Sequence, residues 1–183
     1  TYKRRSIAFL FNGVHEIEVR HCALHNVANA LLAIGCALLF GLDINVIKEK
    51  MQTFDSLDMR LKEIQLKKCV VFDDSYNSNP QSLKQAIDVL CRQTAGSRRI
   101  LVMGDMLELG NKSEGFHAYF GSYVSKKSVD LLITMGHFSK AASESAKKGG
   151  MSAARVFHFE DIPSVLAFLH ITIKEGDILL IKG

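Results

Sequence analysis

Two adjacent carboxylates, Asp73 and Asp74, follow an apolar run that begins at Cys69. The run predicts a buried strand, and the carboxyl ends of strands are where open α/β sheets bind ligands. Side chains alternate along a strand, so only one of the two carboxylates needs to face a ligand. A carboxylate in this place can hold the hydroxyls of a sugar or nucleotide. The alternative is that one carboxylate caps the turn and the other is solvated.

A polar turn leads from these carboxylates into a predicted helix. Asn79 has the residue type of an N-cap, and Pro80 suits the first helical position. Tyr76 and Asn77 lie between the strand and this helix start. The turn either lines the same ligand edge or is a plain loop of turn-forming residues.

A second polar pair, Asn26 and Asn29, lies at the start of another predicted helix. Residues three apart share a helix face, and an amide can donate to and accept from an adenine edge at once. Asn26 can alternatively be a simple N-cap. Asn29 is harder to explain structurally, because an amide in an otherwise apolar helix needs a partner.

Three further features are candidates for binding. Residues 104–110 place Asp105, Glu108 and two glycines after another predicted strand, as a ligand loop or a tight turn. Arg60 lies between the two segments of the chain; a guanidinium suits a phosphate, although single arginines are commonly surface residues. Lys182 and Gly183 end the last apolar strand, which makes that strand end a plausible ligand edge.

The elements that position these residues fall into two segments. Residues 1–57 show a hairpin around Asn12 and Gly13 and two helices, the second after Asp43 with Val46, Ile47 and Met51 on one face. These elements make a poor core, so we expect the end of a larger domain that continues upstream of Thr1. Residues 58–183 alternate short apolar strands with helices, which predicts an α/β, Rossmann-like, mostly parallel sheet with helices on both faces. The expected strands are 6–11, 16–20, 61–66, 69–73, 99–103, 131–135, 155–159 and 178–181, and the expected helices are 26–41, 80–93, 113–126, 139–148 and 162–171.

Composition narrows the classes of function. The 183 residues carry a net charge of +4, but the basic residues are dispersed and not interleaved with aromatics, which argues against nucleic-acid binding. The four cysteines form no C-x-x-C pair and lie in apolar runs, so we expect buried free thiols in a cytoplasmic protein. The apolar run 27–40 is shorter than a membrane span of about 20 residues and predicts a fully buried helix. The sequence has no P-loop motif and no cluster with metal-ligand spacing.

Four segments, 25–31, 73–80, 104–110 and 176–183, together resemble the Mur ligase family, and they occur in that family's order. The run Asp-Asp-Ser-Tyr-Asn-x-Asn-Pro is similar to that of the member that adds D-alanyl-D-alanine. Two departures stand out: Met59 occupies a position where the family usually has Gly, and Ser78 replaces a more usual Ala.

The resemblance implies an ATP-dependent ligase that joins D-alanyl-D-alanine to UDP-N-acetylmuramoyl-tripeptide through an acyl phosphate, in bacterial peptidoglycan synthesis. It implies ATP and Mg²⁺ as cofactors, with the magnesium ligands upstream of this chain, and a monomeric full-length enzyme with neither nucleic acid nor membrane as partner. Residues 1–57 would end the central ATP-binding domain, and 58–183 would be the C-terminal ligase domain.

The resemblance also implies roles for single residues. Asn29 would read the adenine with Asn26 beside it, Asp74 would hold the ribose hydroxyls, and Arg60 would reach the γ-phosphate. The cleft would be shaped by Tyr76, Asn77, Asn79 and Pro80. The chain alone is expected to be inactive.

Other functions remain open from the sequence. A non-catalytic, nucleotide-binding or regulatory relative would keep the fold without the ATPase half. Another family member with a different acceptor amino acid, or a folate-type glutamate ligase, is disfavoured by the Tyr-Asn-x-Asn-Pro run.

Overall fold

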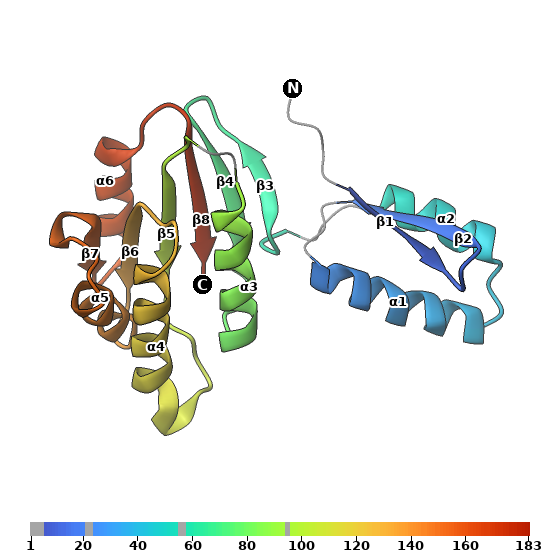
Figure 1. The fold of residues 1–183 in the computed structure, drawn as a ribbon, viewed down its shortest axis with the longest axis horizontal. Coiled ribbons are helices and arrows are strands. Elements are labelled where there is room, and N and C mark those ends of the chain that lie inside the picture. Colours follow the sequence, from blue (N-terminus) through green and yellow to red (C-terminus); the bar gives the residue numbers. More distant parts are fainter. Residues whose placement is uncertain (1–5, 21–23, 55–57, 94–95) are drawn as a thin grey trace. The chain divides into compact units, whose positions relative to one another are not determined.

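The computed structural model describes residues 6–20, 24–54, 58–93 and 96–183. The chain divides into two compact units, Thr1–Leu57 and Asp58–Gly183 (Figure 1).

The first unit contains a hairpin and two helices. Strands β1 (Ser6–Phe11) and β2 (His15–Arg20) pair antiparallel. Asn12, Gly13 and Val14 join them, and the Val14 N–H donates to the Phe11 carbonyl at 3.3 Å. Asn12 (φ 51°) and Gly13 (φ 74°) both have the positive φ angles that such a tight hairpin turn needs. Helix α1 (Leu24–Leu39) precedes α2 (Ile44–Thr53). The side chain of Asp43 caps α2 by accepting a hydrogen bond from the Asn45 amide at 2.8 Å.

The second unit is a six-stranded sheet in the order β3-β4-β8-β5-β6-β7 (Figure 1). Its edge strand β3 pairs antiparallel with β4, and the other pairs are parallel. The predicted mostly parallel sheet is therefore confirmed. The strands are β3 (Lys62–Gln65), β4 (Cys69–Asp74), β5 (Arg99–Met103), β6 (Leu131–Met135), β7 (Val156–Phe159) and β8 (Asp177–Lys182).

Helices cover both faces of this sheet, as predicted. One core cluster packs side chains of α3 (Pro80–Cys91), α4 (Ser113–Ser125) and α5 (Ser139–Lys148) against strand residues such as Leu101 and Leu180. The other cluster packs α6 (Ile162–Thr172) against strand residues such as Val102 and Leu179. The two sets alternate along the strands, as the pleat requires. Short 3₁₀ turns, η1 (Gly110–Lys112) and η2 (Ala153–Arg155), precede α4 and β7.

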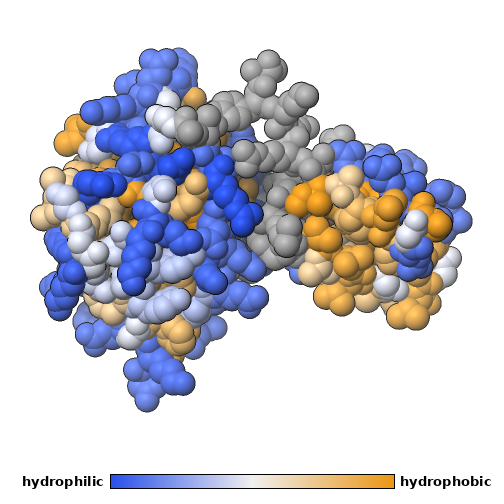
Figure 2. All heavy atoms as spheres, in the orientation of Figure 1, coloured by the Kyte–Doolittle hydropathy of each residue, from blue (hydrophilic) through white to orange (hydrophobic). Residues whose placement is uncertain are grey.

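Helix α1 is not the fully buried helix that its composition predicts. Among its described side chains, Ala30 and Ile34 are buried, whereas Leu32 is 71% and Leu39 88% exposed. The described part of the unit offers a two-stranded hairpin and α2 as cover. Figure 2 accordingly shows apolar residues gathered on the surface of this unit. No helix among the described residues has both the length and the apolar character needed to cross a bilayer.

Two smaller expectations also change. Val46 was expected to share a face with Ile47, but Ile47 is buried and Val46 is 44% exposed. Neighbouring helical positions differ by about 100°, and the core-facing stripe of α2 is too narrow to include both. Of the cysteines expected to be buried, Cys69 is buried, Cys91 is half-buried and Cys36 is exposed on α1. Cys22 lies outside the described residues.

Candidate nucleotide site at the carboxyl edge of the sheet

The candidate site lies where β4, β8 and β5 end. The strand register pairs Asp74 with Lys182, and Lys182 with Met103. Residues paired in register on neighbouring strands point to the same face. The last residues of β4 and β8 therefore place a carboxylate beside an ammonium group at this edge.

Asp74 is the carboxylate around which the site is built. One oxygen, Oδ1, accepts the backbone N–H of Leu61 at 3.1 Å, and the other, Oδ2, lies 3.1 Å from the Lys182 Nζ. Its side chain is only 13% exposed, so it is not the solvated carboxylate of the structural alternative. A carboxylate has about four lone-pair positions, so it can accept from several donors at once.

Asp73 behaves differently, as strand alternation predicts. Its Oδ1 accepts hydrogen bonds from the backbone N–H of Ser75 at 3.1 Å and from the Ser75 hydroxyl at 2.6 Å. Asp73 thus closes the turn after β4, and the two adjacent carboxylates have separate roles.

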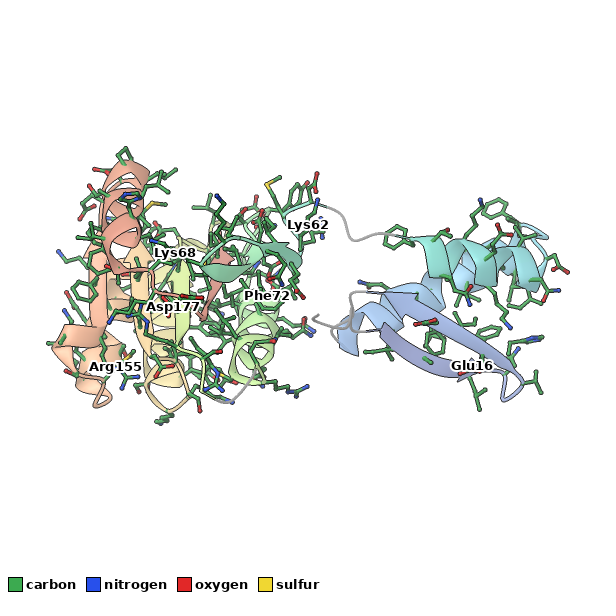
Figure 3. All side chains as sticks on the ribbon, turned by 90° about the horizontal axis from the view of Figure 1, so that it is seen from above. Glu16, Lys62, Lys68, Phe72, Arg155 and Asp177 are labelled. Atoms are coloured by element: carbon green, nitrogen blue, oxygen red, sulfur yellow. The ribbon has the colours of Figure 1, made fainter. Side chains whose placement is uncertain are left out.

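The segment before β3 is docked on the same turn. The carbonyl of Met59 accepts the Tyr76 N–H at 3.1 Å, and the Arg60 guanidinium lies over the Tyr76 ring, 4.5 Å from its centroid. An arginine stacked on an aromatic face keeps its N–H edge available for a phosphate. Figure 3 labels Lys62 and Phe72 on β3 and β4, the strand pair that brings this segment to the turn.

The rest of the turn prepares the start of α3. Asn79 is the N-cap: its Oδ1 accepts the Ser82 N–H at 2.9 Å, and the Ser82 hydroxyl accepts the Asn79 N–H at 3.1 Å. Pro80 opens the helix, as predicted. The Asn77 Oδ1 accepts the Ser78 N–H at 2.7 Å, while Tyr76 is 60% exposed.

The remaining predicted residues, Asn26 and Asn29, lie on helix α1 of the first unit. Helix α1 begins at Leu24, so Asn26 lies in its first turn and is not the N-cap; its side chain lies outside the described part. Asn29 is exposed, so it does not need the protein partner that its place in an apolar helix suggested.

The 104–110 loop has a structural explanation. The Asp105 carboxylate accepts the backbone N–H groups of Phe138 at 3.1 Å and Ser139 at 2.7 Å, at the start of α5. The ring of the buried His117 accepts the Met106 N–H through Nε2 at 2.9 Å, and its Nδ1 lies 2.6 Å from the Ser113 carbonyl. A carbonyl can only accept, so Nδ1 carries the proton. The loop is thereby tied to α4 and α5.

Lys182 is the residue of this edge whose contacts the sequence did not reveal. Its side chain is 2% exposed, and its Nζ donates to the Asp74 carbonyl at 3.2 Å and to the Asn77 carbonyl. The one available signal was a lysine at the end of a buried strand, where a charged group needs a partner.

Comparisons with known proteins agree with this architecture. The profile of the family described as Mur ligase, glutamate ligase domain, matches residues 59–183. Since this match covers more than half of the sequence, the chain belongs to the Mur ligase family. The expected family resemblance is confirmed.

The chain is similar to bacterial proteins named UDP-N-acetylmuramoyl-tripeptide–D-alanyl-D-alanine ligase. It is 33% identical to that of Escherichia coli (strain K12) over 162 residues, which cover 87% of this chain and 34% of the relative. It is 35% identical to that of Haemophilus influenzae over 158 residues, covering 86% and 32%. The chain therefore spans about a third of the length of these relatives.

Solved structures show the same fold. A crystal structure of MurF from Acinetobacter baumannii matches with a TM-score of 0.81 and 28% identity, covering 92% of this chain and 37% of that one. The MurF ligase of Thermotoga maritima in complex with ADP matches with a TM-score of 0.74 over 93% of this chain and 38% of that one. At 18% identity, the second likeness supports the fold alone.

Proposed function

We propose that this chain is part of an ATP-dependent ligase that joins D-alanyl-D-alanine to UDP-N-acetylmuramoyl-tripeptide in peptidoglycan synthesis. The observation that carries the proposal is the docking of Arg60, Asp74 and Tyr76 together at the sheet edge of a Mur ligase family member. The names of the relatives that are 33% and 35% identical supply the substrates.

The proposed reaction needs positioning and charge stabilisation more than covalent chemistry by the protein. The γ-phosphate of ATP passes to the terminal carboxylate of the tripeptide, and the amine of D-alanyl-D-alanine attacks the acyl phosphate. Phosphate leaves as the amide bond forms.

Each residue of the edge has a proposed part in holding the nucleotide. Asp74, oriented by its contacts with Leu61 and Lys182, accepts the ribose hydroxyls. Arg60, oriented by the Tyr76 ring, donates to the γ-phosphate. Tyr76 supplies exposed aromatic surface for the adenine, with Asn77, Asn79 and Pro80 shaping the turn.

The first unit would supply the remaining contacts to the nucleotide. Asn29, with Asn26 on the same helix, would pair with the adenine edge. Closure of the two units around the nucleotide would then assemble the site.

Mg²⁺ would neutralise phosphate charge in this reaction, but the described donor set does not fit it. Asp74 is paired with the Lys182 ammonium group at 3.1 Å, and a divalent cation competes poorly for a carboxylate that is held in this way. We therefore place the magnesium ligands outside this chain.

We further propose that residues 1–57 end a larger ATP-binding domain and that 58–183 form the C-terminal ligase domain. The division at Leu57 and the exposed apolar side chains of α1, visible over the first unit in Figure 2, support this assignment. A helix with such a surface fits the inside of a larger domain. The complete enzyme is proposed to act in the bacterial cytoplasm as a monomer.

The test measures phosphate release with ATP, UDP-N-acetylmuramoyl-tripeptide and D-alanyl-D-alanine. We expect dipeptide-dependent release by the complete protein that carries this chain, and none by residues 1–183 alone. Asp74→Ala should raise the KM for ATP about tenfold or more, as expected when a hydrogen bond to a charged group is lost. Nucleotide binding without dipeptide-dependent turnover by the complete protein would instead favour the regulatory alternative.

A further inference from the structure

The last residue of β8 connects three parts of the candidate site. Lys182 lies between Asp74 on β4 and Met103 on β5 in the strand register. Its ammonium group faces the Asp74 carboxylate, the Asp74 carbonyl and the Asn77 carbonyl. An ammonium group has three N–H donors, so these acceptors match its full capacity.

This contact set fixes the carboxylate more firmly than a single ion pair would. Lys182 holds both the Asp74 side chain and the backbone of the same turn, through Asp74 and Asn77. The second carboxylate oxygen is held separately by the Leu61 N–H. The orientation of the Asp74 carboxylate is therefore determined by two contacts, one to each oxygen. Lys182 makes the contact that comes from the neighbouring strand of the sheet.

We propose that Lys182 is a positioning residue for nucleotide binding: its ammonium group sets the orientation of the Asp74 carboxylate and of the 74–77 turn. The inference rests on the proposed function, because it assigns Lys182 to the same nucleotide site. Lys182 is too enclosed to serve as a surface contact for the ligand, since its side chain is 2% exposed.

The same strand offers a matched control at its other end. Arg98 binds Asp177, the first residue of β8 (labelled in Figure 3), through Nε–Oδ1 at 2.9 Å and an Nη2–Oδ2 contact at 2.6 Å. The Asp177 side chain is 3% exposed. This ion pair also fastens β8 to its surroundings, but it lies at the amino end of the strand, away from the candidate site.

The experiment compares Lys182→Met with Arg98→Met in the complete protein. Both variants should lower the melting temperature, because each leaves a buried carboxylate without its cation. Only Lys182→Met should raise the KM for ATP and the dissociation constant of ADP, by roughly ten- to a hundredfold. The KM for D-alanyl-D-alanine should change far less than that for ATP.

A double substitution tests whether Lys182 acts through Asp74. In an Asp74→Asn background, Lys182→Met should raise the KM for ATP by no more than about threefold, because residues that act as a unit are not additive. Equal effects in both backgrounds would overturn the positioning role. So would nucleotide constants for Lys182→Met that match those of Arg98→Met.

The measurements separate failure of this inference from failure of the proposed function. Absence of dipeptide-dependent turnover by the unaltered protein contradicts the ligase proposal, while ADP binding by the variants still tests Lys182. If Lys182→Met does not fold, Lys182→Gln retains a neutral donor for the turn. An unchanged ADP dissociation constant in that variant would overturn the inference.

Discussion

The two residues that flank Arg60 have left-handed backbone conformations that residues other than glycine rarely adopt. Met59 has φ 58° and Leu61 has φ 52°, and each such residue costs about 1–2 kcal/mol when it is not glycine. Their backbone groups bind Tyr76 and Asp74, which offsets the cost. The expected family pattern has Gly at position 59. The left-handed backbone conformation observed at this position is a physical reason for that preference, because glycine adopts it without strain.

Replacing Met59 by Gly tests this explanation, with Met59→Ala as the matched control. Both changes remove the same partly exposed side chain, but Ala keeps the Cβ that crowds a left-handed backbone. We expect the Gly variant to unfold with a free energy about 1 kcal/mol higher than that of the Ala variant, measured by urea denaturation. Equal stability, or a more stable Ala variant, would show that residue 59 is not strained.

A charged cluster formed by α3, α4 and the residues just after α4 predicts how stability depends on pH. Asp88 accepts hydrogen bonds from the Tyr123 hydroxyl at 2.7 Å and the Lys127 ammonium at 3.0 Å. Burial raises the pKa of Asp88, but the hydrogen bonds from Tyr123 and Lys127 outweigh it and leave the pKa below its ordinary value. A carboxyl whose native pKa is lowered stabilises the fold above its unfolded pKa, near 4, and loses this effect as pH falls through the native pKa.

We therefore expect Asp88→Asn to lower the free energy of unfolding by up to about 1 kcal/mol at pH 7. The difference from the unaltered chain should shrink as the pH falls below about 4. Denaturation curves at several pH values measure it. In a Tyr123→Phe background the effect should be smaller at pH 7, and a difference that persists unchanged at pH 3 would rule out this origin.

At the scale of elements, helix α4 contains two glycines with opposite roles. A Cβ on Gly121 would lie 2.0 Å from the carbonyl oxygen of Ala142 on α5, whereas one on Gly115 would meet nothing within 4 Å. The absence of a side chain at Gly121 thus permits the close approach of two helices. No such packing constraint requires glycine at position 115.

Substituting Ala at each position separates packing from helix propensity. Gly121→Ala should lower the free energy of unfolding by about 2–3 kcal/mol, because the backbone of α5 must move. Gly115→Ala should raise it by about 0.5 kcal/mol through helix propensity and reduced unfolded-state entropy. Thermal and urea unfolding of both variants provide the check; similar effects at both positions would contradict the close helix contact.

Element boundaries were predictable because they depend on local patterns. The ranges of β5, β6 and α5 match the expected 99–103, 131–135 and 139–148, since apolar runs and polar turn residues mark them. The ends of β4 and β8 were less accurate: both strands extend into charged residues, Asp74 and Lys182, where ladder pairing continues beyond the apolar run.

The site was predictable only in part. Residue types identified Asp74 and Asn79, because carboxylates at strand ends and amides at helix starts have local signatures. Lys182, which pairs with Asp74, is 108 residues away from it in sequence. No local pattern predicts that β8 inserts between β4 and β5. The prediction that α1 is fully buried was wrong for a related reason. Hydrophobicity indicates that a helix needs to be covered, but it does not indicate which elements cover it.

At the scale of the molecule, residues 58–183 contain two apolar clusters of their own, one on each face of the sheet. We expect this segment, expressed alone, to unfold cooperatively at the same urea midpoint as the corresponding transition in the longer chain. Far-ultraviolet circular dichroism of both proteins in urea measures this. A segment without a cooperative transition would show that its stability depends on residues 1–57.

The hydrogen bond between Leu61 and Asp74 makes one backbone proton a reporter. While the carboxylate accepts the Leu61 N–H, that amide should exchange slowly with deuterium, because exchange requires the bond to open. Under the proposed function, a ribose hydroxyl that binds the same carboxylate would hold the Leu61 contact closed for longer, and the exchange of this amide should slow further. A single site outside the nucleotide contacts would then record, in an isotope-exchange spectrum, how the bound sugar and the Arg60 segment share one carboxylate.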